Sequence, residues 1–384
     1  MYTRTLESEI KKLSKQFRVI TILGPRQAGK TTLCKICFPS YRYVSLEDPD
    51  VRAFAQEDPR AFFSTYQDEV IIDEIQRVPE LLSYIQTIVD TDQKKAKFIL
   101  TGSDQLGLSE SISQSLAGRT AMFTLLPLSL EELPIGSRTE LECIIEGFMP
   151  EKHYAKIETS HYFRSYFQTY VERDVRRLVK IKDFNLFEKF VRLCAGRIGQ
   201  VLNLSSLGND IGVSSNTMSS WISILEASFI VFRINPFYQN FNKRIIKSSK
   251  LYFVDTGLAC WLLGIDNEKQ LERDPLRGAL FENLVIAECM KAQLNRGIEP
   301  RLYFFRDSQG NEVDLIIHRG RSLVPVEIKS AKTWHSSFLK GIAYFQKLAG
   351  TESTKGQIVY TGDLSRSSEN YDLIPFADCA GFGH

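Results

Sequence analysis

The chain has 384 residues, of which 43% are hydrophobic, and its formal net charge is only +2. This length predicts two or three domains, and the composition is that of a packed globular protein. The near-zero net charge excludes a chain-wide electrostatic attraction to nucleic acid, so any such contact has to be a local basic patch.

The cysteines and the apolar residues limit the cellular setting that we expect. Seven cysteines are scattered and odd in number, which indicates a reducing, cytoplasmic location rather than a disulfide framework. The first residues are polar and mixed in charge, and no apolar run approaches about 18 residues. We therefore expect neither a signal peptide nor contact with a membrane.

Residues 18–32 read RVITILGPRQAGKTT: an apolar strand, a glycine-rich turn and the start of a helix. Gly24, Gly29, Lys30 and Thr31 fit the spacing of a phosphate-binding P-loop, in which glycines let backbone amides approach an oxyanion and the helix N-terminus adds more. We expect Lys30 to reach the β- and γ-phosphates and Thr31 to ligate Mg²⁺. The predicted nucleotide-binding residues are Gly24, Pro25, Arg26, Gln27, Ala28, Gly29, Lys30, Thr31 and Thr32.

Residues 69–75 read EVIIDEI, an apolar strand that ends in two acids and is typical of a Walker B segment. Asp73 is predicted to hold Mg²⁺, and Glu74 to polarise the attacking water as a catalytic residue. Taken alone, the pattern could equally be a buried strand with a solvated acidic end. The P-loop upstream favours the functional interpretation.

Five predicted strands alternate with helices, which specifies a parallel sheet with helices on both faces. The extra strand, at 41–47, resembles the additional-strand class of P-loop ATPases, to which AAA proteins belong. That resemblance implies that Ser103, with Thr101 at the end of the strand 97–104, senses the γ-phosphate. It also implies that Arg119, before a fifth strand at 121–128, reaches the phosphate of a neighbouring subunit; a surface arginine near a helix C-terminus is the alternative.

The middle of the chain carries two basic stretches. A run rich in proline and glycine predicts a domain boundary near 135–155, after which residues 160–181 are predicted to form one long amphipathic helix. The cations on its polar side form either a solvated face or a contact for a phosphate backbone: Arg164, Arg173, Arg176, Arg177 and Lys180. The second stretch comprises Lys243, Arg244, Lys247 and Lys250.

Residues 204–230 are predicted to form a helix-turn-helix unit, followed by a β-rich segment at 229–234 that resembles a wing. In a DNA reader the second helix would be the recognition helix. Between Val213 and Ala227, however, there is no Lys or Arg. This favours a structural or protein-contact module over direct DNA readout.

The C-terminal part is predicted to form a helix and three strands, at 280–293, 301–306, 311–318 and 322–330. Period-2 alternation places Glu327 and Lys329 on one face, with Asp314 one hairpin away. Two convergent carboxylates suit Mg²⁺, and a lysine beside them can orient a water, with Glu282 as a third acid. This is the Asp…Glu-x-Lys constellation of the restriction-endonuclease-like fold. A simple exposed ion pair is the alternative, and the fold alone does not establish cleavage.

The order of these segments resembles a widespread bacterial and archaeal family of AAA-type ATP-binding proteins with a C-terminal domain of unknown function. The resemblance is carried by GPRQAGKTT (24–32), VIIDEI (70–75), ILTGSD (99–104), SLAGRT (115–120), LPLSLEEL (126–133), YVERDV (170–175), KLYFVDTGL (250–258), GALFEN (278–283) and EVDLII…PVEIKS (312–330). It implies ATP rather than GTP, and a C-terminal domain related to restriction-endonuclease-like nucleases. The family's Gly-Gly-Phe-Pro turn is altered at residues 146–150, which concerns the linker geometry and not the nucleotide site.

The predicted fold is therefore α/β, with an AAA-type P-loop sheet, a helical and winged-helix-like middle and a restriction-endonuclease-like C-terminal domain. The predicted boundaries are 1–135 for the ATPase domain, 136–200 for a helical linker, 201–265 for the winged-helix-like unit and 266–384 for the C-terminal domain. The expected function is an ATP- and Mg²⁺-dependent switch whose C-terminal domain binds or cuts nucleic acid. The alternative is a nucleotide-gated scaffold that binds a protein partner. Whether the chain forms a homo-oligomer, such as a remodelling ring, is left undecided.

Overall fold

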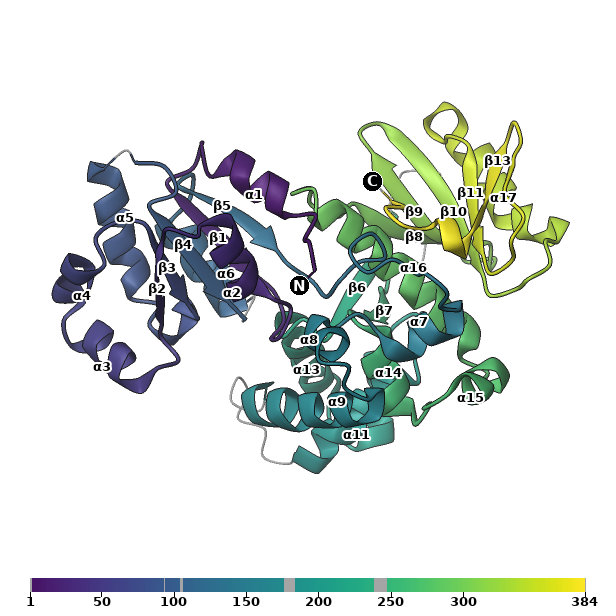
Figure 1. The fold of residues 1–384 in the computed structure, drawn as a ribbon. Helices are drawn as coiled ribbons and strands as arrows, with labels where there is room; N and C mark the ends of the chain where they lie inside the picture. Colours follow the sequence, from purple (N-terminus) through teal and green to yellow (C-terminus); the bar gives the residue numbers. More distant parts are fainter. Residues whose placement is uncertain (1, 93, 104–105, 176–183, 238–246, 384) are drawn as a thin grey trace. The chain divides into compact units, whose positions relative to one another are not determined.

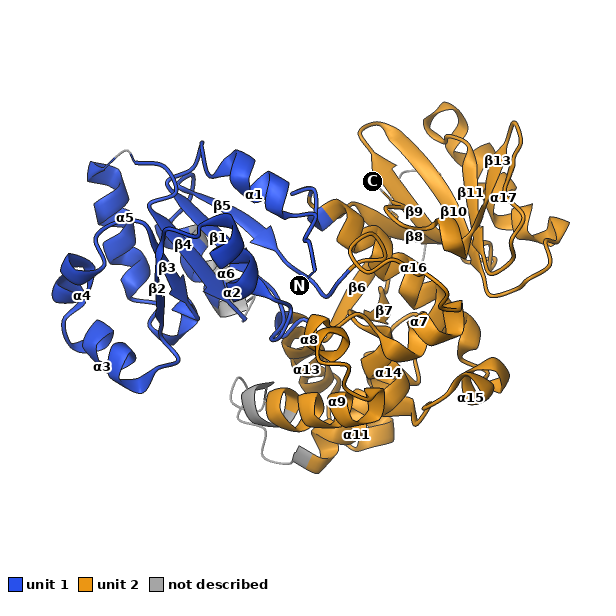
Figure 2. Cartoon of the chain, in the orientation of Figure 1, with its two compact units in different colours: residues 1–128, 227–229, 294–298 blue, residues 129–226, 230–293, 299–384 orange. Residues whose placement is uncertain are grey.

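The structure is a computed structural model that describes residues 2–92, 94–103, 106–175, 184–237 and 247–383 (Figure 1). The chain forms two compact units (Figure 2). The first contains residues 1–128, 227–229 and 294–298, and the second contains residues 129–226, 230–293 and 299–384. The linker, the winged-helix-like unit and the C-terminal domain expected from sequence all fall mainly within the second unit.

The first unit is built on a five-stranded sheet in the order β2-β3-β4-β1-β5, in which all strand pairs are parallel. Its strands are β1 (Val19–Leu23), β2 (Arg42–Ser45), β3 (Val70–Asp73), β4 (Phe98–Gly102) and β5 (Thr120–Thr124). Every residue of β1, β3 and β4 is buried, as expected for a parallel sheet covered on both faces. The predicted parallel sheet is confirmed.

Helix α1 (Glu7–Leu13) precedes β1. The following elements connect consecutive strands: α2 (Lys30–Cys37), α3 (Pro49–Glu57), α4 (Pro59–Thr65), the 3₁₀ turn η1 (Ile75–Arg77), α5 (Leu81–Thr91) and α6 (Leu106–Ser115). The segment between β2 and β3 is polar and acidic. It forms α3 and α4 because Asp48 and Asp58 each cap a helix that begins with proline. The fifth strand ends at Thr124, earlier than expected, because its pairing with β1 stops there.

The second unit begins with a helical region: α7 (Glu140–Glu146), α8 (Pro150–Tyr154), α9 (Thr159–Tyr166), the π-helical segment η2 (Phe167–Val175), α11 (Phe184–Ala195), α12 (Leu204–Ile211) and α13 (Ser215–Ala227). The single helix expected at 160–181 is thus α9 followed by a π-helical stretch, and residues 176–183 lie outside the described residues. Gly212, at φ 85°, ends α12 in a left-handed cap before α13 starts.

An eight-stranded mixed sheet forms the rest of the second unit, in the order β12-β13-β11-β10-β9-β8-β6-β7. Its strands are β6 (Val231–Pro236), β7 (Lys250–Phe253), β8 (Leu302–Arg306), β9 (Glu312–Arg319), β10 (Ser322–Lys329), β11 (Gly356–Tyr360), β12 (Arg366–Ser367) and β13 (Tyr371–Pro375). Helices and 3₁₀ turns join them: α14 (Thr256–Leu263), α15 (Glu268–Arg273), α16 (Arg277–Leu294), η3 (Ser336–Leu339), α17 (Lys340–Ala349) and η4 (Gly350–Glu352). The 3₁₀ turn η5 (Phe376–Asp378) follows β13.

The hairpin β6–β7 follows α13 at the place where a wing was expected, and it also joins the C-terminal sheet. Residues Asn235 and Pro236 of β6 pair in parallel with Tyr303 and Phe304 of β8. Strand β7 therefore belongs to the same sheet as the C-terminal strands β8 to β10. This continuity lets side chains of the middle region contribute to a site on the C-terminal strands.

The turn at residues 146–150, where the chain departs from its family pattern, is held by Asp255. The amide of Phe148 donates to Asp255 Oδ2 at 2.8 Å, and Asp255 also caps α14. A Cβ on Gly147 would lie 2.1 Å from Asp255 Oδ1, so glycine is required at that close approach. His153 Nε2 lies 2.8 Å from the carbonyl oxygen of Gly147 and completes the turn.

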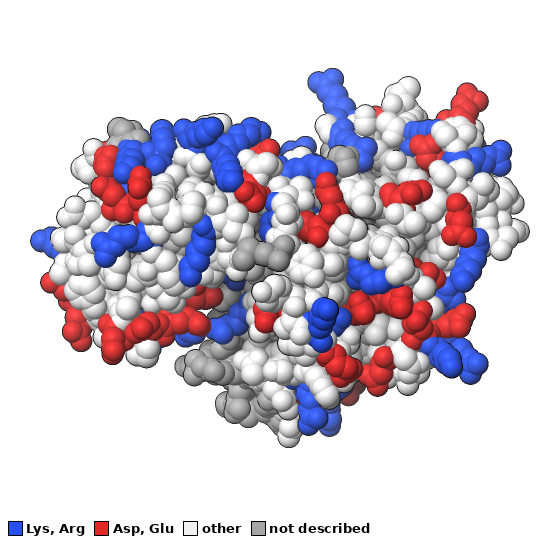
Figure 3. All heavy atoms as spheres, viewed as in Figure 1, with Lys and Arg blue, Asp and Glu red and all other residues white. Residues whose placement is uncertain are grey.

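On the face shown in Figure 3, basic and acidic side chains are interspersed over both units. None of the helices in the described part of the chain combines the length and the apolar character that a bilayer span requires.

Candidate functional site

The P-loop joins β1 to α2, as the sequence predicts. Gly24 has φ 153° and Gly29, the residue before α2, has φ 89°. A Cβ on Gly24 would lie only 2.0 Å from the carbonyl oxygen of Leu125, so a larger residue would displace the loop. The loop therefore curls tightly into the start of α2, where free amides can face a phosphate.

Lys30 lies inside this loop and is 6% exposed. Its Nζ donates to the carbonyl oxygens of Gly24 and Pro25, each at 2.9 Å. Burial lowers the pKa of Lys30, and the nearby carboxylates of Glu74 and Asp73 oppose this shift. The ammonium group is thus held next to the residues that are predicted to bind phosphate.

Asp73 ends β3 and meets the start of α2. Its Oδ2 accepts hydrogen bonds from Thr31 Oγ1 at 3.0 Å and from the Tyr43 hydroxyl at 2.7 Å. Its Oδ1 accepts one from Thr101 Oγ1 on β4. The two predicted Mg²⁺ ligands, Asp73 and Thr31, are therefore in contact, and a carboxylate with a hydroxyl is the oxygen donor set that Mg²⁺ prefers.

Glu74 lies beside Asp73 and adopts the left-handed conformation, with φ 57°, which is uncommon for a residue other than glycine. Its Oε2 accepts hydrogen bonds from Ser103 Oγ at 2.9 Å and from Gln76 Nε2. Its backbone amide donates to Thr101 Oγ1 at 3.3 Å. The predicted catalytic acid and the predicted sensor Ser103 are thus joined directly.

Three residues of this site were missed in the sequence analysis: Tyr43, Gln76 and Arg4. Tyr43, on the neighbouring strand β2, binds Asp73, and Gln76 links Glu74 to Ser103. Arg4 is 6% exposed and donates to the carbonyl oxygens of Ala28 and Leu126, both at 2.7 Å. The sequence does not mark these roles, because Tyr43 and Arg4 bind partners far away in the chain and Gln76 also reaches Ser103, 27 residues away.

Arg119 is not brought to the P-loop of its own chain. Its backbone oxygen accepts from the Val19 amide, so it lies where β1 and β5 begin, whereas the P-loop follows the other end of β1. Its guanidinium binds both oxygens of Asp90, at 2.6 and 2.7 Å. A role of Arg119 at a neighbouring subunit stays a prediction.

A second charged cluster lies on the hairpin β9–β10. Val326 pairs with Leu315, so Glu327 lies opposite Asp314. Lys329 Nζ binds Asp314 Oδ2 at 2.9 Å and Glu327 Oε2 at 2.5 Å. The structure therefore brings together the three residues of the predicted Asp…Glu-x-Lys constellation.

The carboxylates of this pair have opposite pKa shifts. Burial, followed by the charge of Asp314, raises the pKa of Glu327 to about 8. Burial also acts to raise the pKa of Asp314, but the ammonium groups of Lys329 and Lys250 outweigh it and lower that pKa overall. Asp314 is thus the carboxylate that keeps its charge at neutral pH.

Glu282, on α16, is linked to this cluster by two side chains of strand β7, Tyr252 and Lys250. The Tyr252 hydroxyl donates to Glu282 Oε1 at 2.5 Å, and Lys250 Nζ lies 3.2 Å from the same oxygen. Lys250 is 3% exposed and also binds Glu312 Oε1 at 2.7 Å. Burial raises the pKa of Glu282 against the effect of Lys250, and the charge of Asp314 adds to the increase. Lys250, expected as part of a basic stretch, is instead buried between these carboxylates.

The predicted metal ligands Glu282, Asp314 and Glu327 thus share one cluster with the ammonium groups of Lys250 and Lys329. Within the described ranges, no three His, Cys, Asp or Glu side chains are grouped in a way that could hold a metal ion. Metal binding by this cluster stays a prediction. We refer to these five residues as the carboxylate–lysine cluster.

Most of the two basic stretches falls outside the described side chains. This applies to Arg173, Arg176, Arg177, Lys180, Lys243 and Arg244. Arg164 and Lys247 are exposed, whereas Lys250 is buried in the carboxylate–lysine cluster.

Three family models match the chain in order. An AAA domain matches residues 16–134, a domain of unknown function (DUF8612) matches residues 138–269, and a domain of unknown function (DUF4143) matches residues 277–379. Among solved structures, the Walker-type ATPase paby2304 of Pyrococcus abyssi has a TM-score of 0.45 at 15% identity, covering 67% of this chain and 94% of that chain. AMPPCP-bound DnaA from Aquifex aeolicus has a TM-score of 0.30 at 14% identity, covering 58% and 86%. These structural likenesses are too distant to support an argument about activity.

Sequence relatives are closer. Uncharacterized protein Rv2008c of Mycobacterium tuberculosis is 32% identical over 82% of this chain and 71% of its own length. Uncharacterized protein MJ1637 of Methanocaldococcus jannaschii is 22% identical over 93% of this chain and 83% of its own length. The chain therefore belongs, with Rv2008c, to a family that joins an AAA-type P-loop ATPase domain to a C-terminal DUF4143 domain.

Proposed function

We propose that the chain binds and hydrolyses ATP in an Mg²⁺-dependent reaction. The observation that carries this proposal is a single hydrogen-bonded network that joins α2, β3 and β4 beside the P-loop: Thr31 and Thr101 bind Asp73, and Ser103 binds Glu74. A sheet that served only as a scaffold would have no need to collect these polar groups next to a buried lysine.

Each residue has a distinct role in the proposed reaction. Lys30 and the P-loop amides bind the β- and γ-phosphates, Ser103 contacts the γ-phosphate, and Thr31 and Asp73 hold Mg²⁺. The metal, when bound, supplies positive charge against the phosphate oxygens. Glu74 orients and polarises the attacking water, and its carboxylate is positioned for this by Ser103 and Gln76.

The test is ATP turnover by the full chain and its variants. Lys30→Ala should abolish nucleotide binding, whereas Glu74→Gln should bind ATP and lose turnover by about 10²- to 10⁴-fold, the usual contribution of a general base. Glu57→Gln, which changes an exposed acid of the same unit, is the matched control and should hydrolyse at the wild-type rate. Wild-type turnover by Glu74→Gln would show that Glu74 is not the base.

We further propose that ATP controls a nuclease-like domain that acts on or binds nucleic acid. The convergence of Asp314, Glu327 and Lys329 supports this proposal. Asp314 and Glu327 would hold Mg²⁺, and Lys329 would orient a water against the phosphodiester. Mg²⁺-dependent cleavage of DNA and RNA should be lost in Lys329→Ala and kept in Lys269→Ala, which removes an exposed lysine of α15. Equal background cleavage by the wild type and Lys329→Ala would end the nuclease proposal.

The second candidate function is a nucleotide-gated scaffold or signalling protein in which the C-terminal domain grips a protein partner. The absence of Lys and Arg between Val213 and Ala227 on α13 favours it. The two functions differ in how nucleic-acid binding depends on salt, because neutralising phosphates releases counterions. Binding that is negligible and flat from 50 to 200 mM salt, roughly the range over which phosphate contacts are lost, would favour the scaffold.

A ring of subunits is also a proposal, in which Arg119 contacts the nucleotide of a neighbouring subunit after leaving Asp90. In that case ATP should shift the full chain to a larger mass in analytical ultracentrifugation, and Arg119→Ala should lose hydrolysis without losing ATP binding. A monomer at all ATP concentrations would exclude the ring.

A further inference from the structure

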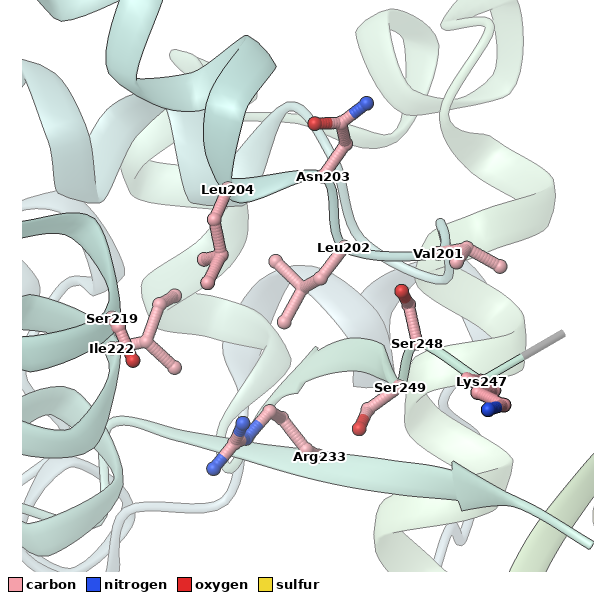
Figure 4. Close-up of a pocket in the computed structure, with 10 residues that line it drawn as sticks. All are labelled: Val201, Leu202, Asn203, Leu204, Ser219, Ile222, Arg233, Lys247, Ser248 and Ser249. Atoms are coloured by element: carbon pink, nitrogen blue, oxygen red, sulfur yellow. The ribbon is translucent and has the colours of Figure 1, made fainter. Parts of the chain in front are cut away.

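A pocket of about 730 Å³ lies in the second unit, beside the helix-turn-helix (Figure 4). Its walls come from the segment 201–204 that leads into α12, from α13, from Arg233 on β6 and from the segment 247–249 before β7. Ligand sites commonly have volumes between about 300 and 1,000 Å³, so this pocket can hold a group of nucleotide size.

The pocket has an apolar side and a polar side. The side chains of Leu202, Leu204 and Ile222 point toward one another in Figure 4, and Ser248 and Ser249 lie across from them. An apolar wall of this kind suits a base or sugar, whereas hydroxyl groups suit the oxygens of a phosphate.

The charged residues that line the pocket are both cations, Arg233 and Lys247. Arg233 is held in place by Glu226, which accepts from its Nε at 2.8 Å and its Nη2 at 2.7 Å. Lys247 is exposed, and no ion pair joins it to another side chain in the described part of the chain. The pocket therefore favours an anionic ligand, and Lys247 provides the uncompensated charge.

The pocket wall is physically continuous with the carboxylate–lysine cluster. The Leu202 amide donates to the Ser249 carbonyl at 2.8 Å, and Val201 forms an antiparallel bridge with Lys250. Ser249 lines the pocket, whereas the next residue, Lys250, extends its side chain to Glu282. Adjacent side chains of an extended segment point to opposite sides, so the pocket and the cluster share this stretch of backbone and lie on its two sides.

We propose that this pocket holds one nucleotide of a single-stranded nucleic acid. The apolar wall takes the base or sugar, and Lys247 with the Ser248 hydroxyl takes the phosphate, because the Ser249 hydroxyl already donates to Asn235 Oδ1 at 2.7 Å. This inference rests on the proposed action on nucleic acid and specifies where the strand is gripped. It also places the binding site beside α13, whose own sequence contains no Lys or Arg.

The test measures binding of a fluorescein-labelled 12-nucleotide oligothymidylate to the full chain by fluorescence anisotropy, in EDTA and without ATP. Neutralising one phosphate contributes a slope of about −0.7 to the plot of log affinity against log salt for single strands. Lys247→Ala should therefore weaken binding about fivefold at 0.1 M salt and make this slope about 0.7 less negative. Ser219→Trp, which fills the pocket from α13, should weaken binding at least as much, and Lys269→Ala should match the wild type.

The outcomes separate this proposal from the proposed function. If the wild type binds the oligonucleotide and both pocket variants bind equally well, the pocket proposal is wrong and binding of nucleic acid elsewhere on the chain stands. If the wild type does not bind the oligonucleotide, both the pocket proposal and the proposed action on nucleic acid are wrong. If thymidine monophosphate alone binds as tightly as the oligonucleotide, the pocket is a mononucleotide site and the strand proposal is overturned.

Discussion

Tyr43 offers a direct test of how the nucleotide site is organised. Its hydroxyl donates to Asp73 Oδ2 at 2.7 Å, and burial together with this hydrogen bond raises the pKa of Tyr43, so the group stays a donor at neutral pH. The Lys35 ammonium lies over the Tyr43 ring, 3.8 Å from its centre, in a cation–π contact. Tyr43→Phe keeps the ring and removes only the donor.

The expected magnitude follows from the kind of hydrogen bond that is lost. A hydrogen bond to a charged group contributes about 1.5–3 kcal/mol. Tyr43 is 40% exposed, so water can replace part of this, and a net loss of about 1 kcal/mol is reasonable. Because Asp73 is the proposed Mg²⁺ ligand, that loss should raise the Mg²⁺ concentration needed for half-maximal ATP hydrolysis roughly fivefold.

The assay is the ATP hydrolysis rate as a function of free Mg²⁺ at saturating ATP. Tyr41→Phe is the matched control, because Tyr41 is half-buried and packs on the core of the same unit. The maximal rate of Tyr43→Phe should change little, since Tyr43 acts through Asp73 and does not contact the reacting atoms. An Mg²⁺ dependence of Tyr43→Phe identical to that of the wild type would refute the positioning role of this tyrosine.

Three further predictions concern stability and ATP affinity. Gly341→Ala should lower the free energy of unfolding by about 1–3 kcal/mol in urea titrations, because the added Cβ would lie 2.2 Å from Glu327 Oε1. The control Gly278→Ala should be neutral or stabilising, because the added Cβ would have its nearest contact at 3.5 Å. Arg4→Met should weaken ATP binding at least fivefold in isothermal titration calorimetry, because two carbonyl oxygens beside the nucleotide site lose their hydrogen-bond donor. An unchanged ATP affinity would contradict this. Burial lowers the pKa of His153 below 6.5, so the unfolded chain binds more protons as the pH falls. Stability should drop from pH 7.5 to 5.5, and less steeply in His153→Gln.

Short, contiguous patterns made the central features predictable from sequence. The P-loop is a single uninterrupted motif, so its strand, turn and helix were placed correctly around Lys30. The pairing of Asp314 with Glu327 followed from the alternation of two adjacent strands, whose register in the structure brings these residues opposite each other. The roles assigned to these residues stay predictions until they are measured.

Tyr43 and Lys250, whose roles were not predicted, act across long sequence separations. Tyr43 and Asp73 are 30 residues apart, and Lys250 and Glu282 are 32 residues apart. Contacts of this kind depend on strand order: β2 lies beside β3, and β7 joins the C-terminal sheet through β6. Local patterns therefore could not show that a lysine from a basic stretch would be buried among carboxylates.

The central claim is that the segment between β1 and α2 binds ATP with Mg²⁺. Isothermal titration of the full chain with ATP in the presence of Mg²⁺ tests it most directly, with Lys30→Ala as the paired variant and circular dichroism to show that both are folded. We predict saturable binding to the wild type and none to Lys30→Ala. A folded wild-type chain that shows no saturable heat, or a Lys30→Ala variant that binds equally well, would contradict the account.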